Sequence, residues 1–133
     1  MNEQRNDRGL LLVAKADLHM AEYAINKKDP IFLNQAVFHI SQVIEKIVKY
    51  LCSCHGIEYS YSHYLLELVD LLLEKEVKIP QLVRDSLREY GDWATKSRYS
   101  SAQLVQRSYV EKQYNCAKEW LTAVEKQIMF FQD

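Results

Sequence analysis

The most regular pattern of apolar and polar positions lies in residues 32–50, which contain neither Gly nor Pro. Its apolar residues recur every three or four positions, the repeat of an α-helix. They form one stripe: Leu33, Ala36, Val37, Ile40, Val43, Ile44, Ile47, Val48 and Leu51. On the opposite side, also at helical spacing, lie Phe38, Gln42, Glu45 and Lys49. An aromatic ring among polar side chains is unusual for a solvated face. We therefore expect both sides of this helix to be covered, one by the core and one by a pocket or a partner.

The same periodicity predicts four further helices. The first begins at about residue 7 and carries its apolar edge to residue 25, and the third covers residues 62–73. A shorter fourth helix covers residues 80–90, with a break from Gly91 onward. The last has apolar positions that alternate steps of four and three over residues 110–131, a heptad seam. Because the chain already supplies neighbouring helices, this seam favours a bundle helix over an isolated coiled coil.

Local signals mark the ends of these helices. Asp29 can cap the second helix, and Pro30 suits its first turn because the N–H that proline lacks is unpaired there anyway. Gly56 is placed as a left-handed stop, and Ser62 as the cap of the third helix. The short connections favour antiparallel neighbours. We predict an all-α, up-and-down bundle of four or five helices in one domain, residues 9–132, after a flexible N-terminus at residues 1–8.

Composition narrows the class of protein. The 133 residues are 48% hydrophobic and 26% charged, and three Gly and two Pro are too few for the turns of an all-β fold. A net charge of −1 gives no reason to expect non-specific nucleic-acid binding, although a local basic patch stays open. Three Cys, no signal-type segment and no apolar run of membrane length predict a reduced, cytoplasmic protein.

The segment FHISQVIEKIVKYL resembles the central helix of HEPN domains, whose pattern runs roughly Phe-His-x-x-Gln-x-x-Glu-Lys-x-x-Lys-x-x-Leu. The matching residues are Phe38, His39, Gln42, Glu45, Lys46, Lys49 and, offset by one, Leu51. Asp17 with its neighbours is similar to the family's first helix, His63 to its His-x-Leu segment, and Arg98-Tyr99 to its Arg-Tyr motif. The resemblance covers about residues 11–128 and implies a helical bundle that commonly forms dimers.

The ribonuclease motif of the HEPN family is absent from this chain. Many HEPN proteins are ribonucleases, including toxins paired with nucleotidyltransferase antitoxins, and carry an Arg followed four to six residues later by His. No Arg of this chain has a His at that distance. The resemblance therefore implies nucleotide binding, or pairing with a nucleotidyltransferase, in a dimer without the family's ribonuclease chemistry. Two alternatives remain: an unusual ribonuclease that uses His63 and Arg98, and a purely structural interaction bundle. An arrangement of His39, His63 and Arg98 unrelated to the family's motif could also be hydrolytic.

The candidate ligand site combines the polar side of the second helix with residues beyond it. Its members are Phe38, Gln42, Glu45, Lys46, Lys49, His63, Arg98 and Tyr99. Carboxylate, amide and ammonium groups can hold a nucleotide by hydrogen bonds, with an aromatic ring against the base. The same polar side is equally consistent with a solvated face supported by i,i+4 pairs or with a dimer interface.

The remaining candidates each have a structural alternative. His63 can act as a general base or a phosphate contact, or make only a structural hydrogen bond. Arg98 and Tyr99 offer a phosphate fork and a stacking ring, but Arg98 can equally tie its loop to Glu45 or Asp17. The cysteines at Cys52 and Cys54 lack the spacing of zinc ligands. We expect neither a metal nor a cofactor.

Overall fold

A computed structural model of the chain describes residues 2–60, 64–95 and 105–131, and the side chains of residues 8–60, 64–95 and 105–127. Every regular element in these ranges is a helix. Three helices are long: α1 (Asn2–Asn26), α2 (Pro30–Cys54) and α6 (Arg107–Phe131). Three are short: α3 (Leu65–Glu74), α4 (Gln81–Asp85) and α5 (Leu87–Thr95). The predicted all-α bundle is confirmed.

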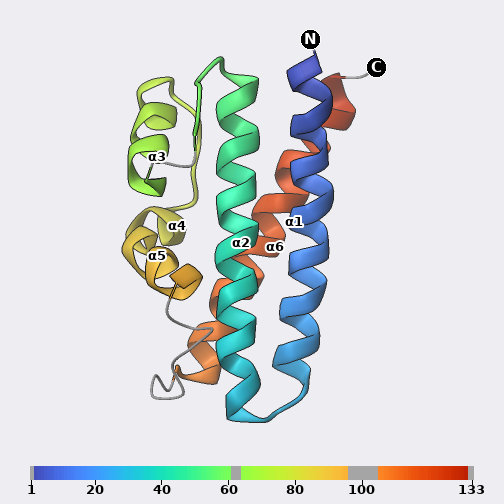
Figure 1. Cartoon of the computed structure of the whole chain (residues 1–133), viewed down its shortest axis with the longest axis vertical. Coiled ribbons are helices and arrows are strands. Elements are labelled where there is room, and N and C mark those ends of the chain that lie inside the picture. Colours follow the sequence, from blue (N-terminus) through green and yellow to red (C-terminus); the bar gives the residue numbers. More distant parts are fainter. Residues whose placement is uncertain (1, 61–63, 96–104, 132–133) are drawn as a thin grey trace.

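The long helix α2 lies at the centre of the bundle (Figure 1). Helix α1 runs antiparallel beside it, and α6 crosses behind both. The short helices α3, α4 and α5 stack along the opposite side of α2. The chain ends of α1 and α6 meet at the same end of the molecule.

The predicted ends of α2 are confirmed. The carboxylate of Asp29 accepts a hydrogen bond from the Ile31 amide at 3.1 Å, and Pro30 occupies the first turn. Beyond the other end, Gly56 has a φ of +70°, a conformation that residues with a Cβ seldom adopt. A cap at one end and a left-handed glycine at the other fix the length of this central helix.

Helix α2 is buried on one side and half-buried on the other through its middle. Every apolar-stripe residue is buried, and the polar residues between Ala36 and Cys52 are buried or half-buried. The core side of the predicted helix is confirmed, and the pocket or partner expected on its polar side stays a prediction. On α6, the seam positions Val110, Ala117 and Leu121 are likewise buried, as a bundle helix requires.

Three predicted boundaries were wrong. Helix α1 begins at Asn2 rather than near residue 7. The predicted fourth helix is two helices, α4 and α5, separated at Ser86. Gly91 does not begin a break but lies inside α5, because the burial of Tyr90 and Trp93 outweighs the cost of about 1 kcal/mol for a helical glycine. The predicted cap Ser62 lies outside the described residues, and α3 starts after Tyr64 without a side-chain cap.

A buried polar network explains the division between α4 and α5. The Gln113 side chain on α6 is fully buried; its Nε2 donates to Ser86 Oγ at 2.9 Å, and its Oε1 accepts from the Tyr90 hydroxyl at 2.6 Å. The same Nε2 lies 3.0 Å from the hydroxyl of Tyr109, which donates to Glu89 at 2.6 Å. The network holds the start of α5 against α6 and uses the Ser86 hydroxyl at the break.

Candidate functional site

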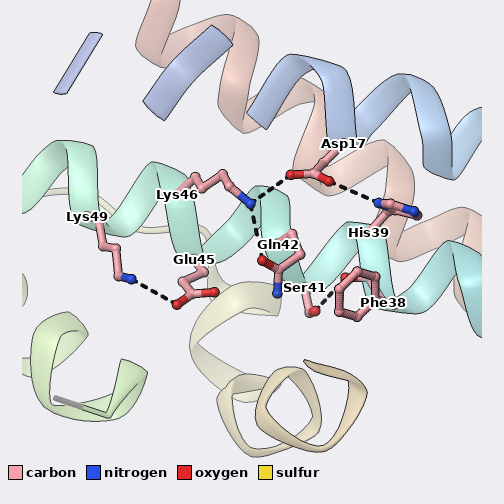
Figure 2. Close-up of polar contacts among 8 residues, drawn as sticks. All are labelled: Asp17, Phe38, His39, Ser41, Gln42, Glu45, Lys46 and Lys49. Atoms are coloured by element: carbon pink, nitrogen blue, oxygen red, sulfur yellow. Dashed lines mark hydrogen bonds and ion pairs between the residues drawn. The ribbon is translucent and has the colours of Figure 1, made fainter. Parts of the chain in front are cut away.

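Asp17 is the centre of a polar cluster between α1 and α2. One carboxylate oxygen, Oδ1, accepts a hydrogen bond from His39 Nδ1 at 2.9 Å, and the other, Oδ2, lies 2.8 Å from Lys46 Nζ. The three side chains are only 14%, 20% and 19% exposed, respectively. Figure 2 shows Asp17 reaching from α1 between His39 and Lys46, with both of its oxygens engaged. The cluster therefore joins two helices through charged groups shielded from most of the solvent.

The spacing of residues on α2 explains why the cluster forms. His39, Gln42 and Lys46 are separated by three and four positions, so they share the side of α2 that borders α1. Lys46 Nζ also donates to Gln42 Oε1 at 3.1 Å. A single ammonium thus bridges a carboxylate on α1 and an amide on α2. We name this set, made of Asp17, His39, Gln42 and Lys46, the Asp17 cluster.

The contact with Asp17 decides which nitrogen of His39 carries a proton. An ionised carboxylate only accepts hydrogen bonds, so Nδ1 must be the donor. In the neutral ring, Nε2 is then left with a lone pair. Nε2 points away from Asp17 in Figure 2, and within the described part of the chain it has no hydrogen-bond partner. An imidazole oriented in this way can accept a proton from a bound molecule.

The carboxylate of Asp17 is held in its charged form. Burial by itself would raise the pKa of Asp17, but hydrogen bonds from His39 and Lys46, together with the positive charge of Lys46, outweigh burial and lower the pKa below its usual value of 3.8. The cluster at neutral pH is therefore built on an ionised Asp17. Its negative charge in turn keeps Lys46 from being an uncompensated buried cation.

A second ion pair lies further along α2. Lys49 Nζ is 3.0 Å from Glu45 Oε1, and the two side chains are 18% and 38% exposed. The same ammonium lies 5.9 Å from the centre of the Tyr59 ring, in the segment that follows α2. At the N-terminal end of the polar side of α2, the Phe38 ring contacts the His39 ring edge-on, with the ring centroids 5.2 Å apart. Aromatic rings thus border both ends of the polar side.

The structure brings together five of the eight predicted ligand residues and divides them into two groups. Gln42 and Lys46 belong to the Asp17 cluster, whereas Glu45 and Lys49 pair with each other. Phe38 lies half-buried on the same side of α2. The other three predicted residues, His63, Arg98 and Tyr99, lie outside the described residues. Their place in the site stays a prediction.

The sequence-based site did not include Asp17 or His39, although both matched the family pattern. The available signal was the position of Asp17 beside the apolar edge of α1, next to Leu18. An acidic residue there must be either exposed or paired. Its partners are 22 and 29 residues away, and helical spacing within α1 cannot identify them.

The cysteines differ from one another in burial. Cys52 is buried on α2, and burial raises its pKa to about 11, whereas Cys54 is exposed.

Among the residues described, no three His, Cys, Asp or Glu side chains are grouped closely enough to hold a metal ion. Likewise, none of the helices in the described ranges is long and apolar enough to cross a membrane.

Comparison with known protein families identifies the family to which this chain belongs. The family model for the HEPN domain matches residues 8–127, most of the chain. The chain belongs to the HEPN domain family. The resemblance found in the sequence of α2 is therefore confirmed at the level of the family. In this HEPN domain the pattern residues His39, Gln42 and Lys46 belong to the Asp17 cluster, Glu45 and Lys49 form the neighbouring ion pair, and Phe38 contacts His39.

A solved structure shares the fold. The crystal structure of TT1696 from Thermus thermophilus is similar with a TM-score of 0.67, over 95% of this chain and 98% of that chain. The two sequences are 22% identical, so the similarity concerns the fold alone. No curated protein matches this chain.

Proposed function

We propose that this HEPN domain is a non-catalytic module that binds a nucleotide on the polar side of α2, forms a dimer and acts with a nucleotidyltransferase. The observation that carries the proposal is the half-buried pair of ammonium groups, Lys46 and Lys49, on one side of a helix whose opposite side is core. Charged side chains are seldom retained in such positions without a specific role.

The charge balance of this side indicates the kind of ligand. Lys46 is paired with Asp17 and Lys49 with Glu45, so the ammonium charges are already compensated. A bare polyphosphate would have to displace carboxylates to reach both cations. A ligand with donors, acceptors and an aromatic face fits better, because Gln42 can both donate and accept and the rings of Phe38 and Tyr59 lie near the ends of this side. A nucleotide has these features.

Thermal unfolding tests nucleotide binding. A ligand at 100 times its Kd adds about 2.7 kcal/mol to the free energy of unfolding, so ATP, GTP, AMP or GMP should raise the Tm. Lys49→Ala should remove most of the rise, and Lys49→Arg, which keeps the charge, should retain part of it. Lys118→Ala, an exposed lysine on α6, is the matched control and should respond like the natural protein. A Tm unmoved by every nucleotide refutes the binding role.

One observation favours a second candidate, a hydrolytic activity. The Asp17–His39 contact at 2.9 Å orients the imidazole as in carboxylate-assisted general bases, with Nε2 available to take the proton of a hydroxyl group. This candidate differs from the ribonuclease chemistry of the family, whose Arg-His spacing is absent here.

The hydrolytic candidate is tested by incubating the protein with RNA. His39→Asn keeps a side-chain N–H that can donate to Asp17 but removes the Nε2 base, so cleavage should be lost while the fold is retained. The exposed His19→Asn variant is the control and should cleave like the natural protein. A natural protein that leaves RNA intact at high concentration excludes this candidate.

The nucleotidyltransferase partner rests on family membership rather than on a surface of this chain. A gene for a small nucleotidyltransferase beside the gene for this chain would support it. Mixing the two purified proteins and measuring the mass of the assembly by light scattering would test it directly. Separate elution of both proteins at micromolar concentration counts against the partnership.

A further inference from the structure

Helix α1 carries a second apolar face in addition to the one in the core. Leu12, Val13, Met20 and Tyr23 are 71%, 49%, 51% and 58% exposed, respectively. They lie on the arc of α1 opposite its buried edge, which is made of Leu11, Ala14, Leu18, Ala21 and Ile25. Their exposure shows that neither α2 nor α6 covers this arc. Contiguous exposed apolar side chains of this kind commonly mark an interaction surface.

The spacing on this face is that of a helix which pairs lengthwise with another helix. Its central positions alternate steps of four and three: Gly9, Val13, Ala16, Met20, Tyr23 and Lys27. This is a heptad repeat, distinct from the positions of α1 that enter the core. We name these six residues the outer seam. At 1.5 Å per residue the seam extends about 27 Å along the helix.

The outer seam matches itself in one antiparallel register, centred beside Leu18. In that register Ala16 faces Met20 of a second copy, and Val13 faces Tyr23. At each end, Gly9 faces the long side chain of Lys27. Every layer therefore combines a smaller residue with a larger one, which allows the two helices to approach evenly. In a dimer with two-fold symmetry, each of these residue pairs occurs twice.

The flanking positions carry almost no charge. On one flank they are Leu12, His19 and Asn26, and on the other Leu10, Asp17 and Ala24. Asp17 is the charged member, and its carboxylate is already compensated by Lys46. Charged flanking residues are what direct a helix to a foreign, oppositely charged partner. Apart from Asp17 the flanks of this seam carry no charge, and the pairing of Asp17 with Lys46 limits repulsion between the two copies of Asp17.

Two further charged residues of α1, Lys15 and Glu22, contact α6 instead. Lys15 lies 3.9 Å from Glu125, and Glu22 accepts a hydrogen bond from the Tyr114 hydroxyl at 2.6 Å. Both lie outside the arc of the outer seam. They therefore neither assist nor oppose a second copy seated on that seam.

We propose that the outer seam of α1 is the docking surface for a second copy of this chain, in an antiparallel, two-fold dimer. The inference rests on the dimer proposed above, and it assigns that dimer to α1 rather than to Phe38 and the polar side of α2. Because Asp17 is next to the centre of the register, the Asp17 clusters of the two copies lie on either side of the axis. The dimer would then bring the two ligand sites close together.

Analytical ultracentrifugation with matched variants tests the assignment. The natural protein should sediment as a dimer and Met20→Lys as a monomer, because the substitution places a charge in two central layers. Leu66→Lys is the control; it makes the same kind of change at a residue of α3 that is 57% exposed, and should remain dimeric. Circular dichroism should show the same helix content in all three proteins, since both positions are exposed.

Cross-linking tests the register independently. With Cys54→Ser as background, Ala16→Cys combined with Met20→Cys should give a disulfide-linked dimer under mild oxidation, and Ala16→Cys alone should not. A natural protein that is monomeric at all concentrations overturns the inference, as does a dimer that survives Met20→Lys. A dimer broken only by Phe38→Glu moves the interface to α2. The nucleotide-dependent rise in Tm of the natural protein is measured separately, so failure of the dimer and failure of ligand binding are distinguishable.

Discussion

Asp17 and Lys46 are 29 residues apart in the chain, and their carboxylate and ammonium groups lie 2.8 Å apart between α1 and α2. This pair fixes the register of the two antiparallel helices at the level of the candidate site. Both groups are mostly buried, so neither tolerates the loss of the other.

Replacing Asp17 should destabilise the fold. Asp17→Asn keeps the size of the side chain but leaves Lys46 without a counter-charge, at an expected cost of about 2 kcal/mol. Urea unfolding at neutral pH measures the difference. Asp70→Asn, at an exposed acidic residue of α3, is the control and should change the free energy of unfolding by less than about 0.5 kcal/mol. Equal stability of the two variants would contradict the structural role of the pair.

The contribution of Asp17 should depend on pH in one direction. His39 and Lys46 face Asp17 and lower its pKa below the usual 3.8, so the folded state binds this proton less readily than the unfolded chain. The stabilisation is therefore fully present above about pH 4 and is lost as the pH falls through the lower folded-state value. The free-energy difference between the natural protein and Asp17→Asn should shrink on acidification below pH 4. A difference that widens there would contradict the assignment.

The buried network at Gln113 makes a separate prediction. Tyr90→Phe removes the hydroxyl that donates to Gln113 Oε1 and leaves that buried oxygen unpaired, at a cost of about 1 to 2 kcal/mol. Tyr64→Phe, at a tyrosine that is 75% exposed, should have little effect. Thermal unfolding of the two variants provides the comparison, and an unchanged Tm for Tyr90→Phe would show that the network adds no stability.

Thiol reactivity should separate the two cysteines of α2. Iodoacetamide at pH 8 should modify Cys54 within minutes and leave Cys52 unmodified, because Cys52 is buried and its pKa is raised to about 11. Tandem mass spectrometry can assign the label to either residue. Both should react in concentrated urea, and rapid labelling of Cys52 in the folded protein would mean that α2 opens locally.

Local periodicity was sufficient to predict the bundle and the buried stripe of its central helix. Leu33 through Leu51 follow one repeat, and Asp29 and Gly56 act on their immediate neighbours. The division at Ser86 could not be predicted in this way, because its hydroxyl is engaged by Gln113, 27 residues further along the chain. Local periodicity could not predict the candidate functional site either. Lys46 and Gln42 lie on one helix, but the carboxylate that organises them comes from α1.

The polar side of α2 is the centre of the functional proposal, and amide NMR spectra recorded during a nucleotide titration test it most directly. With ATP, GTP, AMP or GMP, we predict saturable chemical-shift changes concentrated in residues 38–49 and around Asp17, and their loss in Lys49→Ala. Spectra that do not change with any of these nucleotides, or changes confined to the exposed face of α6 around Lys118, would contradict the proposal.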